Sequence, residues 1–107
     1  MNNMRDRQEG FERKFAMDEE MRFKAMARRN KMLGLWAAER LGKSGAEADE
    51  YAKEVVRADF QEAGDDDVLR KVRGDLEAAG RGVSDADIRR TMDDLLAQAV
   101  QQLQQQG

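Results

Sequence analysis

The chain has 107 residues, which is room for one domain. It contains no cysteine, histidine or proline, so a disulfide framework, a thiol nucleophile, a Cys/His zinc site and an imidazole base are excluded. No window approaches the run of about 18 apolar residues that crosses a membrane, and residues 1–17 are too charged for a secretory signal. We therefore expect a cytoplasmic protein without metal or required cofactor.

The composition favours helices over disorder. Leu, Ile, Val and Phe make up 19 of the 107 residues, close to the level of about 20% below which disorder becomes common. Ala, Glu, Lys, Leu and Arg make up 52 residues, near the roughly one half that is typical of long-helix proteins. The net charge is only −3, whereas disordered chains combine low hydrophobicity with high net charge. The chain is therefore predicted to be helical.

The charge is unevenly distributed along the chain. Residues 1–43 carry a net charge of +4, and residues 44–107 carry a net charge of −7. The basic first part is consistent with an anionic partner, but also with a solvated helix face that is crossed by ion pairs. Asp18 with Arg22, and Glu20 with Lys24, are acid-before-base pairs at i,i+4 and favour the second interpretation.

The first predicted helix begins near Asp18. Acidic residues occupy 18–20, where the helix dipole favours negative charge, and Gly42 supplies the stop. Its apolar residues recur at helical spacing, at Phe23, Met26, Leu33, Ala37 and Leu41. Residues 32–38 are apolar almost all round, so this helix is expected at the centre of the core, with Trp36 as a packing residue.

The second and third helices are defined by caps and glycines. Ser44 and Glu47 form a predicted capping box, and Gly64 ends the second helix. Asp65 is the predicted N-cap of the third helix, which stops before Gly80. The apolar faces are Ala48, Tyr51, Ala52, Val55 and Val56 in the second helix and Leu69, Val72, Leu76 and Ala79 in the third.

The fourth helix is predicted to start at Ser84, whose cap is flanked by a hydrophobic staple of Val83 and Ile88. Its stripe is Ile88, Met92, Leu95, Leu96, Ala99 and Leu103. No window shows the period-2 alternation of a strand. The predicted fold is an all-α four-helix bundle over residues 18–103, with a flexible or helical N-terminal leader (residues 1–17) and a disordered tail (residues 104–107).

Three apparent chemical motifs fail on their context. Residues 37–44 fit a relaxed Walker A pattern with Ala in place of the first Gly, but they end a helix, whereas a phosphate loop follows a strand. The acidic run 65–67 lacks EF-hand spacing and suits a helix start. Asp93 and Asp94 lie on an exposed helix face without a neighbouring base. No nucleophile, acid and oxyanion donor assemble, so we do not expect an enzyme.

The leader carries two aromatic residues among basic ones. Phe11 and Phe15 are i,i+4 neighbours on one helical face, and Arg13 and Lys14 lie between them. One interpretation is that this stripe extends the first helix and packs on the bundle. The other is that the leader folds as an amphipathic helix into the groove of a partner. The residues alone leave both interpretations open.

Long strings in the chain resemble the zeta subunit family, small inhibitor proteins of the alphaproteobacterial F-type ATP synthase. The strings that carry this resemblance are residues 6–7, 11–16, 18–25, 27–38, 51–56 and 67–76. They cover most of the chain except its first few residues and the Gln-rich tail. Such long strings are far more specific than a short motif.

The resemblance implies a four-helix bundle that restrains ATP hydrolysis by inserting its N-terminal segment between subunits of the catalytic head. Carried onto this chain, the partner-binding residues would be Phe11, Arg13, Lys14 and Phe15, and the protein would associate peripherally with the membrane-bound ATP synthase. The resemblance also implies an adenine nucleotide, ADP or ATP, as a regulatory ligand, although no motif locates its site. We interpret the basic residues Arg28, Arg29 and Lys31 as ordinary solvated charges.

The alternative is a small helical regulator, unrelated to ATP synthase, that binds protein or nucleic acid through its basic first helix. The net charge of −3 and the acidic second part argue against nucleic acid, because phosphate binding requires a continuous positive face.

Overall fold

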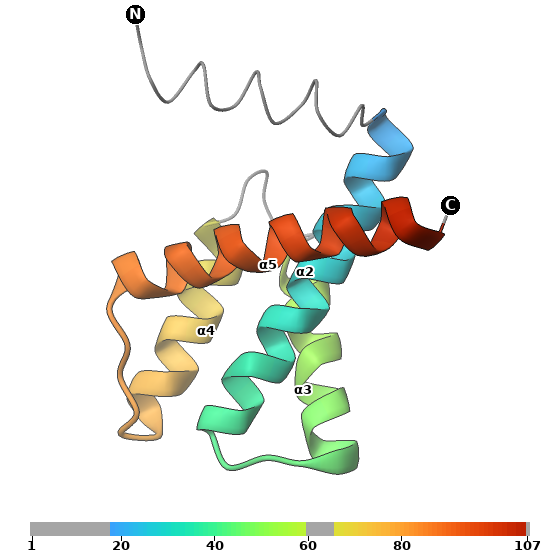
Figure 1. Cartoon of the computed structure of the whole chain (residues 1–107). Helices are drawn as coiled ribbons and strands as arrows, with labels where there is room; N and C mark the ends of the chain where they lie inside the picture. The colour runs from blue at the N-terminus through green and yellow to red at the C-terminus, as the bar shows by residue number, and fades with distance from the viewer. Residues whose placement is uncertain (1–17, 60–65, 107) are drawn as a thin grey trace, which may run out of the picture.

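Four helices make up the part of the chain that the computed structural model describes, which is residues 18–59 and 66–106. They are α2 (Glu19–Arg40), α3 (Gly45–Ala58), α4 (Asp66–Ala78) and α5 (Asp85–Gln106), as labelled in Figure 1. The described residues contain no strand. The predicted all-α class with four helices is therefore confirmed.

The start of α2 lies where the sequence places it. Asp18 has an extended backbone, and its side chain accepts a hydrogen bond from the Met21 amide at 2.8 Å. This bond satisfies one of the free amides of the first turn. Glu19 and Glu20 add negative charge at the positive end of the helix dipole.

The end of α2 is a Schellman turn built on Gly42. Gly42 has a φ of +78°, a conformation that costs glycine nothing but strains other residues. The Lys43 amide donates to the Ala38 carbonyl at 2.9 Å, and the Gly42 amide donates to the Glu39 carbonyl at 3.2 Å. The run that resembled a Walker A motif is therefore a helix end followed by a turn, as predicted.

The predicted caps of α3 and α5 have different outcomes. Ser44 precedes α3 but makes no side-chain capping hydrogen bond, so the predicted capping box is wrong. The reason is local, because Gly45 enters the helix with a φ of +56° and changes the direction of the first turn. Ser84 does cap α5, because its hydroxyl accepts from the Asp87 amide at 3.2 Å. The predicted boundary residues Gly64 and Asp65 lie outside the described residues.

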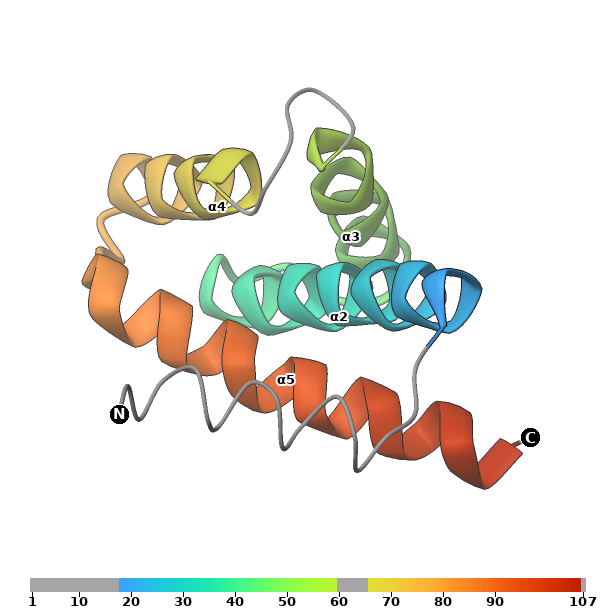
Figure 2. The same ribbon diagram turned by 90° about the horizontal axis from the view of Figure 1, so that it is seen from above.

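Helix α2 lies at the centre of the arrangement and packs mainly against α3 and α5. Seen from above in Figure 2, α2 lies between these two helices. Helix α5 crosses α2, with its first turns beside α4 and its last turns beside the N-terminal half of α2. Two exposed ion pairs connect α4 to α5, Arg73 with Asp85 at 3.0 Å and Arg89 with Asp66 at 2.9 Å.

The core contains most of the predicted apolar stripes. Its buried cluster comprises Leu33, Ala37, Ala38, Tyr51, Val55, Val68, Leu69, Val72, Leu76, Ile88 and Met92. Trp36 is partly buried against this cluster, which confirms it as a packing residue. Ala79, predicted for the stripe of α4, is exposed because the helix ends one residue earlier.

The predicted stripe of α2 is wrong at its N-terminal end. Phe23 is 61% exposed, whereas Ala25 is fully buried. The buried face continues from Ala25 through Arg29 to Leu33, at steps of four residues. Phe23, two residues before Ala25, lies roughly 200° around the helix axis from it.

The predicted disordered tail is also not what the structure shows, because α5 continues through Gln106. Glutamine is a good helix former, and no Gly or Pro interrupts the segment before Gly107. Leu103 in this last part of the helix is half-buried, so packing contributes to its order.

Candidate functional site

The four predicted partner-binding residues, Phe11, Arg13, Lys14 and Phe15, lie outside the described residues. The structure describes the point to which the leader is attached. Asp18 caps the central helix α2 and is exposed, so residue 17 joins the bundle at the beginning of its most contacted helix. Partner binding by the leader stays a prediction at this point.

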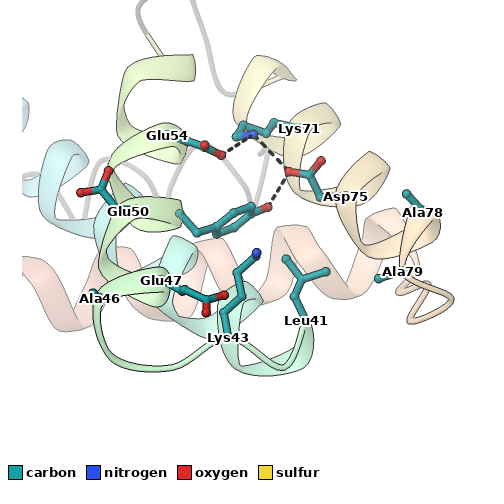
Figure 3. A pocket seen from close by; sticks show the side chains of 11 residues that line it. Leu41, Lys43, Ala46, Glu47, Glu50, Glu54, Lys71, Asp75, Ala78 and Ala79 are labelled. Atoms are coloured by element: carbon teal, nitrogen blue, oxygen red, sulfur yellow. Dashed lines mark hydrogen bonds and ion pairs between the residues drawn. The ribbon is translucent and has the colours of Figure 1, made fainter.

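A groove with a volume of about 650 Å³ lies between α3 and α4. The turn after α2 closes one end of it, as Figure 3 shows. Its apolar lining is Leu41, Ala46, Ala78 and Ala79, and its polar lining is Lys43, Glu47, Glu50, Tyr51, Glu54, Lys71 and Asp75. We call this hollow the acidic groove, because four carboxylates face two lysines.

A polar cluster spans the acidic groove from α3 to α4. The Tyr51 hydroxyl donates to Oδ2 of Asp75 at 2.8 Å. The Lys71 ammonium donates to the same oxygen at 3.1 Å and pairs with Oε2 of Glu54 at 3.4 Å, as the dashed lines in Figure 3 show. The ammonium also lies 5.2 Å from the centre of the Tyr51 ring, within the range of a cation–π contact.

The cluster is built to connect helices rather than to perform chemistry. Burial raises the pKa of the Tyr51 phenol, and the hydrogen bond and negative charge of Asp75 and the charge of Glu54 raise it further. The phenol therefore stays protonated at neutral pH and acts as a donor. The Lys71 side chain lies between the carboxylates of Glu54 and Asp75. These contacts fasten α3 to α4.

Sequence reasoning missed this cluster. The only local signal is the i,i+4 spacing of Lys71 and Asp75 on α4. The partner residues Tyr51 and Glu54 come from another helix, so the cluster depends on the tertiary arrangement.

The acidic groove does not suit the adenine nucleotide that the resemblance implies. Nucleotide phosphates are held by amides at helix N-termini or by arginine and lysine side chains. Lys71 is already paired with Asp75 and Glu54, and the groove's carboxylates outnumber its lysines. A phosphate placed there would meet net negative charge, so we assign no nucleotide site to this groove.

The basic residues of α2 are not all solvated, and the prediction for Arg29 is wrong. Arg29 is 1% exposed and its Nε donates to Oδ1 of the buried Asn30 at 2.8 Å. A charge at this depth requires hydrogen-bond partners, which makes Arg29 part of the packing. Arg28 is half-buried and donates to Oε1 of Gln102 at 3.3 Å. Lys31 is exposed, as predicted.

The described residues contain no group of three or more acidic residues placed to hold a metal ion. Within residues 18–59 and 66–106, no helix has the length and apolarity that a membrane crossing requires.

Comparison with known proteins decides the family. A sequence model described as ATPase inhibitor subunit zeta matches residues 1–102. The chain belongs to this family. The match includes the leader, all of α2, α3 and α4 and most of α5 of this zeta-family chain, and it confirms the resemblance that the long strings indicate.

A solved structure gives the same fold. A chain described as a solution NMR structure is 54% identical to this zeta-family chain and superposes with a TM-score of 0.72. The match covers 81% of this chain and 99% of the other. A search among curated proteins finds no match.

Family membership indicates a regulatory protein, because the family is one of ATPase inhibitor subunits. It therefore does not support the alternative of a helical regulator unrelated to ATP synthase.

Proposed function

We propose that this zeta-family chain inhibits ATP hydrolysis by an F-type ATP synthase by inserting its leader between subunits of the catalytic head. The observation that carries the proposal is the family match, which begins at residue 1 and therefore includes the leader. The matched region also contains all of α2, α3 and α4 and most of α5.

The mechanism is physical obstruction. A rotary ATPase must open and close its catalytic interfaces in turn, and a helix bound in an open interface opposes its closure. Phe11 and Phe15 supply the apolar area, at about 1.5–3 kcal/mol for each ring that becomes fully buried. Arg13 and Lys14 assist docking onto an acidic rim.

The bundle determines where the leader can go. The described helices form a core with one another, in which Leu33, Leu76 and Ile88 are fully buried. The leader is therefore attached through Asp18 to a folded body that remains outside the catalytic interface. In this proposal the protein is a peripheral subunit on the cytoplasmic side of the membrane-bound enzyme.

An adenine nucleotide, ADP or ATP, is part of the proposal as a regulatory ligand, without an assigned site. Titration of the labelled protein with each nucleotide, followed by amide NMR shifts, tests it. Saturable shifts at submillimolar nucleotide would support this part of the proposal. No shift with either nucleotide would remove it and leave the inhibitor role unaffected.

The decisive experiment is ATP turnover by the isolated catalytic head of the cognate ATP synthase with increasing amounts of the full chain. Saturable inhibition is expected. A head that hydrolyses ATP at an unchanged rate with a large excess of folded protein would overturn the proposed function.

A further inference from the structure

Phe23 is a large apolar side chain that the bundle leaves 61% exposed. It lies near the start of α2, four residues after the first residue of the helix. Single exposed apolar residues are ordinary, so its surroundings decide whether it has a role.

The surroundings of Phe23 are strongly basic. Two adjoining shallow grooves, each of about 430 Å³, share Lys31 and Val56 and run along α2 and α3. Their cations are Lys24, Arg28 and Lys31 from α2 and Lys53 and Arg57 from α3. The only carboxylate among the described lining residues is Asp49. We call this surface, with Phe23, the cationic face.

The local ion pairs of the cationic face are weak. Lys24 pairs with Glu20 at 3.1 Å and Lys53 pairs with Glu50 at 3.4 Å, and all four side chains are more than half exposed. Exposed pairs of this kind contribute little to stability. These lysines can therefore exchange their present partners for carboxylates of another molecule.

Apolar side chains from three helices accompany the charges. Phe23 and Ala27 of α2, Val56 of α3 and Leu103 of α5 line the same groove as Lys24 and Lys31. The Arg28–Gln102 hydrogen bond connects α2 to the end of α5 beside this groove. A surface with an exposed aromatic ring and a rim of cations has the composition of a protein interface.

We propose that the cationic face docks an acidic surface of the catalytic head of ATP synthase, as a second contact beyond the leader. The inference rests on the proposed function and extends it to the bundle. Charge complementarity indicates an acidic partner, because five cations and one carboxylate line the two grooves, and the ion pairs of Lys24 with Glu20 and of Lys53 with Glu50 are exposed. Phe23 and Lys24 of this face lie in the first two turns of α2, close to the point where the leader joins the bundle, so a head that holds the leader would lie near them.

A matched pair of charge reversals tests the proposal. The test variant carries Lys24→Glu and Lys31→Glu in the cationic face. The control variant carries Arg81→Glu and Arg90→Glu, which make the same change in net charge at exposed positions near the α4–α5 connection. That connection lies at the other end of the molecule from the start of α2 (Figure 1). The measurement is the concentration of full-length protein that gives half-maximal inhibition of ATP hydrolysis at low salt, with circular dichroism to verify folding.

The first variant is expected to raise this concentration at least about fivefold at low salt and to leave the inhibition at saturation unchanged. The difference should shrink near 1 M salt, where the screening length falls to about 3 Å. The control variant should stay within about twofold of the unmodified protein. Phe23→Ser should weaken inhibition at low and high salt alike, and Phe23→Leu should restore most of it.

The outcomes separate this inference from the proposed function. Normal inhibition by the folded Lys24/Lys31 variant would overturn the second contact and leave the leader mechanism intact. Equal weakening by both charge variants would also overturn it, because the effect would then be one of net charge. If the cationic face instead bound vesicles of phosphatidylglycerol, and the Lys24/Lys31 variant lost that binding but inhibited normally, the partner would be a lipid surface. Failure of the unmodified chain to inhibit would overturn the proposed function itself.

Discussion

Gly34 of α2 lies directly against Ala52 of α3, so the two helix backbones touch at this point. A methyl group built on Gly34 would lie 2.5 Å from the Ala52 Cα atom and 3.3 Å from Cγ2 of Val55. No real Cβ atom tolerates the first distance, and the obstructing atom belongs to the backbone. Glycine at position 34 is therefore what allows the central helix and α3 to approach so closely.

Gly34→Ala is expected to destabilise the protein, although alanine is the better helix former by about 1 kcal/mol. The clash forces the helices apart, and overpacking of this kind costs about 1–3 kcal/mol. Urea unfolding followed by circular dichroism measures the change. Gly74→Ala on α4 is the control, because a methyl group there meets nothing within 4 Å. It should raise the free energy of unfolding by up to about 1 kcal/mol, and a stabilised Gly34→Ala protein would contradict the close contact.

Leu76→Ala removes a fully buried side chain from the middle of α4. It should lower the free energy of unfolding by about 2–5 kcal/mol, from lost burial and the cavity that remains. The same urea titration measures it. An unchanged midpoint would mean that α4 presents another face to the core.

Tyr51→Phe tests the polar cluster of the acidic groove. It removes the hydrogen bond to Asp75 but keeps the ring, and Lys71 still pairs with that carboxylate. The expected loss is about 1 kcal/mol of unfolding free energy at neutral pH. A gain in stability would show that the hydroxyl is not satisfied in the folded protein.

The same residue predicts a pH dependence. The pKa of Tyr51 is higher in the folded than in the unfolded protein, so its contribution is complete below about pH 10, the ordinary pKa of tyrosine. Above that value the unfolded chain loses the proton first, and stability falls as pH rises. The difference in unfolding free energy between the unmodified protein and Tyr51→Phe should therefore shrink above pH 10.

The chain offers a direct readout, because Tyr51 is its single tyrosine. Absorbance of tyrosinate near 295 nm reports the titration of this residue alone. Half-titration near pH 10 in the folded protein would contradict the raised pKa.

Periodic apolar stripes predicted α3, α4 and α5 well because these helices have one apolar and one polar face. Val55, Val72 and Ile88 lie on clear apolar faces, and each is fully buried. The helix cap at Ser84 depends only on neighbouring residues, and it forms as predicted. Ser44 fails because the positive φ of Gly45 cannot be read from the capping pattern.

The orientation of α2 could not be predicted in the same way. This helix has small or apolar residues on several sides, so its neighbours decide which face is buried. The helices approach closely at Gly34. Ala25 and Arg29 lie on the buried side of α2, and Phe23 is exposed. The acidic groove could not be predicted from the sequence either, because its central hydrogen bond joins two residues that are 24 positions apart.

Deleting residues 1–17 should leave a folded bundle, because α2 starts at Glu19 with its own cap at Asp18 and the described helices bury a core together. Helical circular dichroism and cooperative thermal unfolding are expected to persist in the truncated chain. Loss of cooperative unfolding would show instead that Phe11 and Phe15 belong to the core. That result would favour the interpretation in which the leader packs on the bundle.

The double substitution Phe11→Ala and Phe15→Ala should preserve the fold and abolish inhibition of ATP hydrolysis by the isolated catalytic head. These rings are the largest apolar groups of the leader, and they share one helical face if the leader is helical. Central apolar residues carry most of the binding energy in an interface, whereas the flanking charges mainly steer the encounter. The measurement is ATP turnover against added protein, with circular dichroism to verify folding.

Charge reversal at Arg13 and Lys14 is the matched comparison within the same leader. It leaves both rings in place, so it should weaken inhibition mainly at low salt, because exposed charges are screened over about 8 Å at physiological ionic strength. The two variants thus separate burial from steering: the first should inhibit poorly at every salt concentration, and the second should recover as salt is raised. Full inhibition by the folded Phe11/Phe15 variant would eliminate the leader's rings as the groups that hold it in the catalytic interface. Loss of inhibition by the charge variant at all salt concentrations would mean that Arg13 and Lys14 make buried contacts rather than rim contacts.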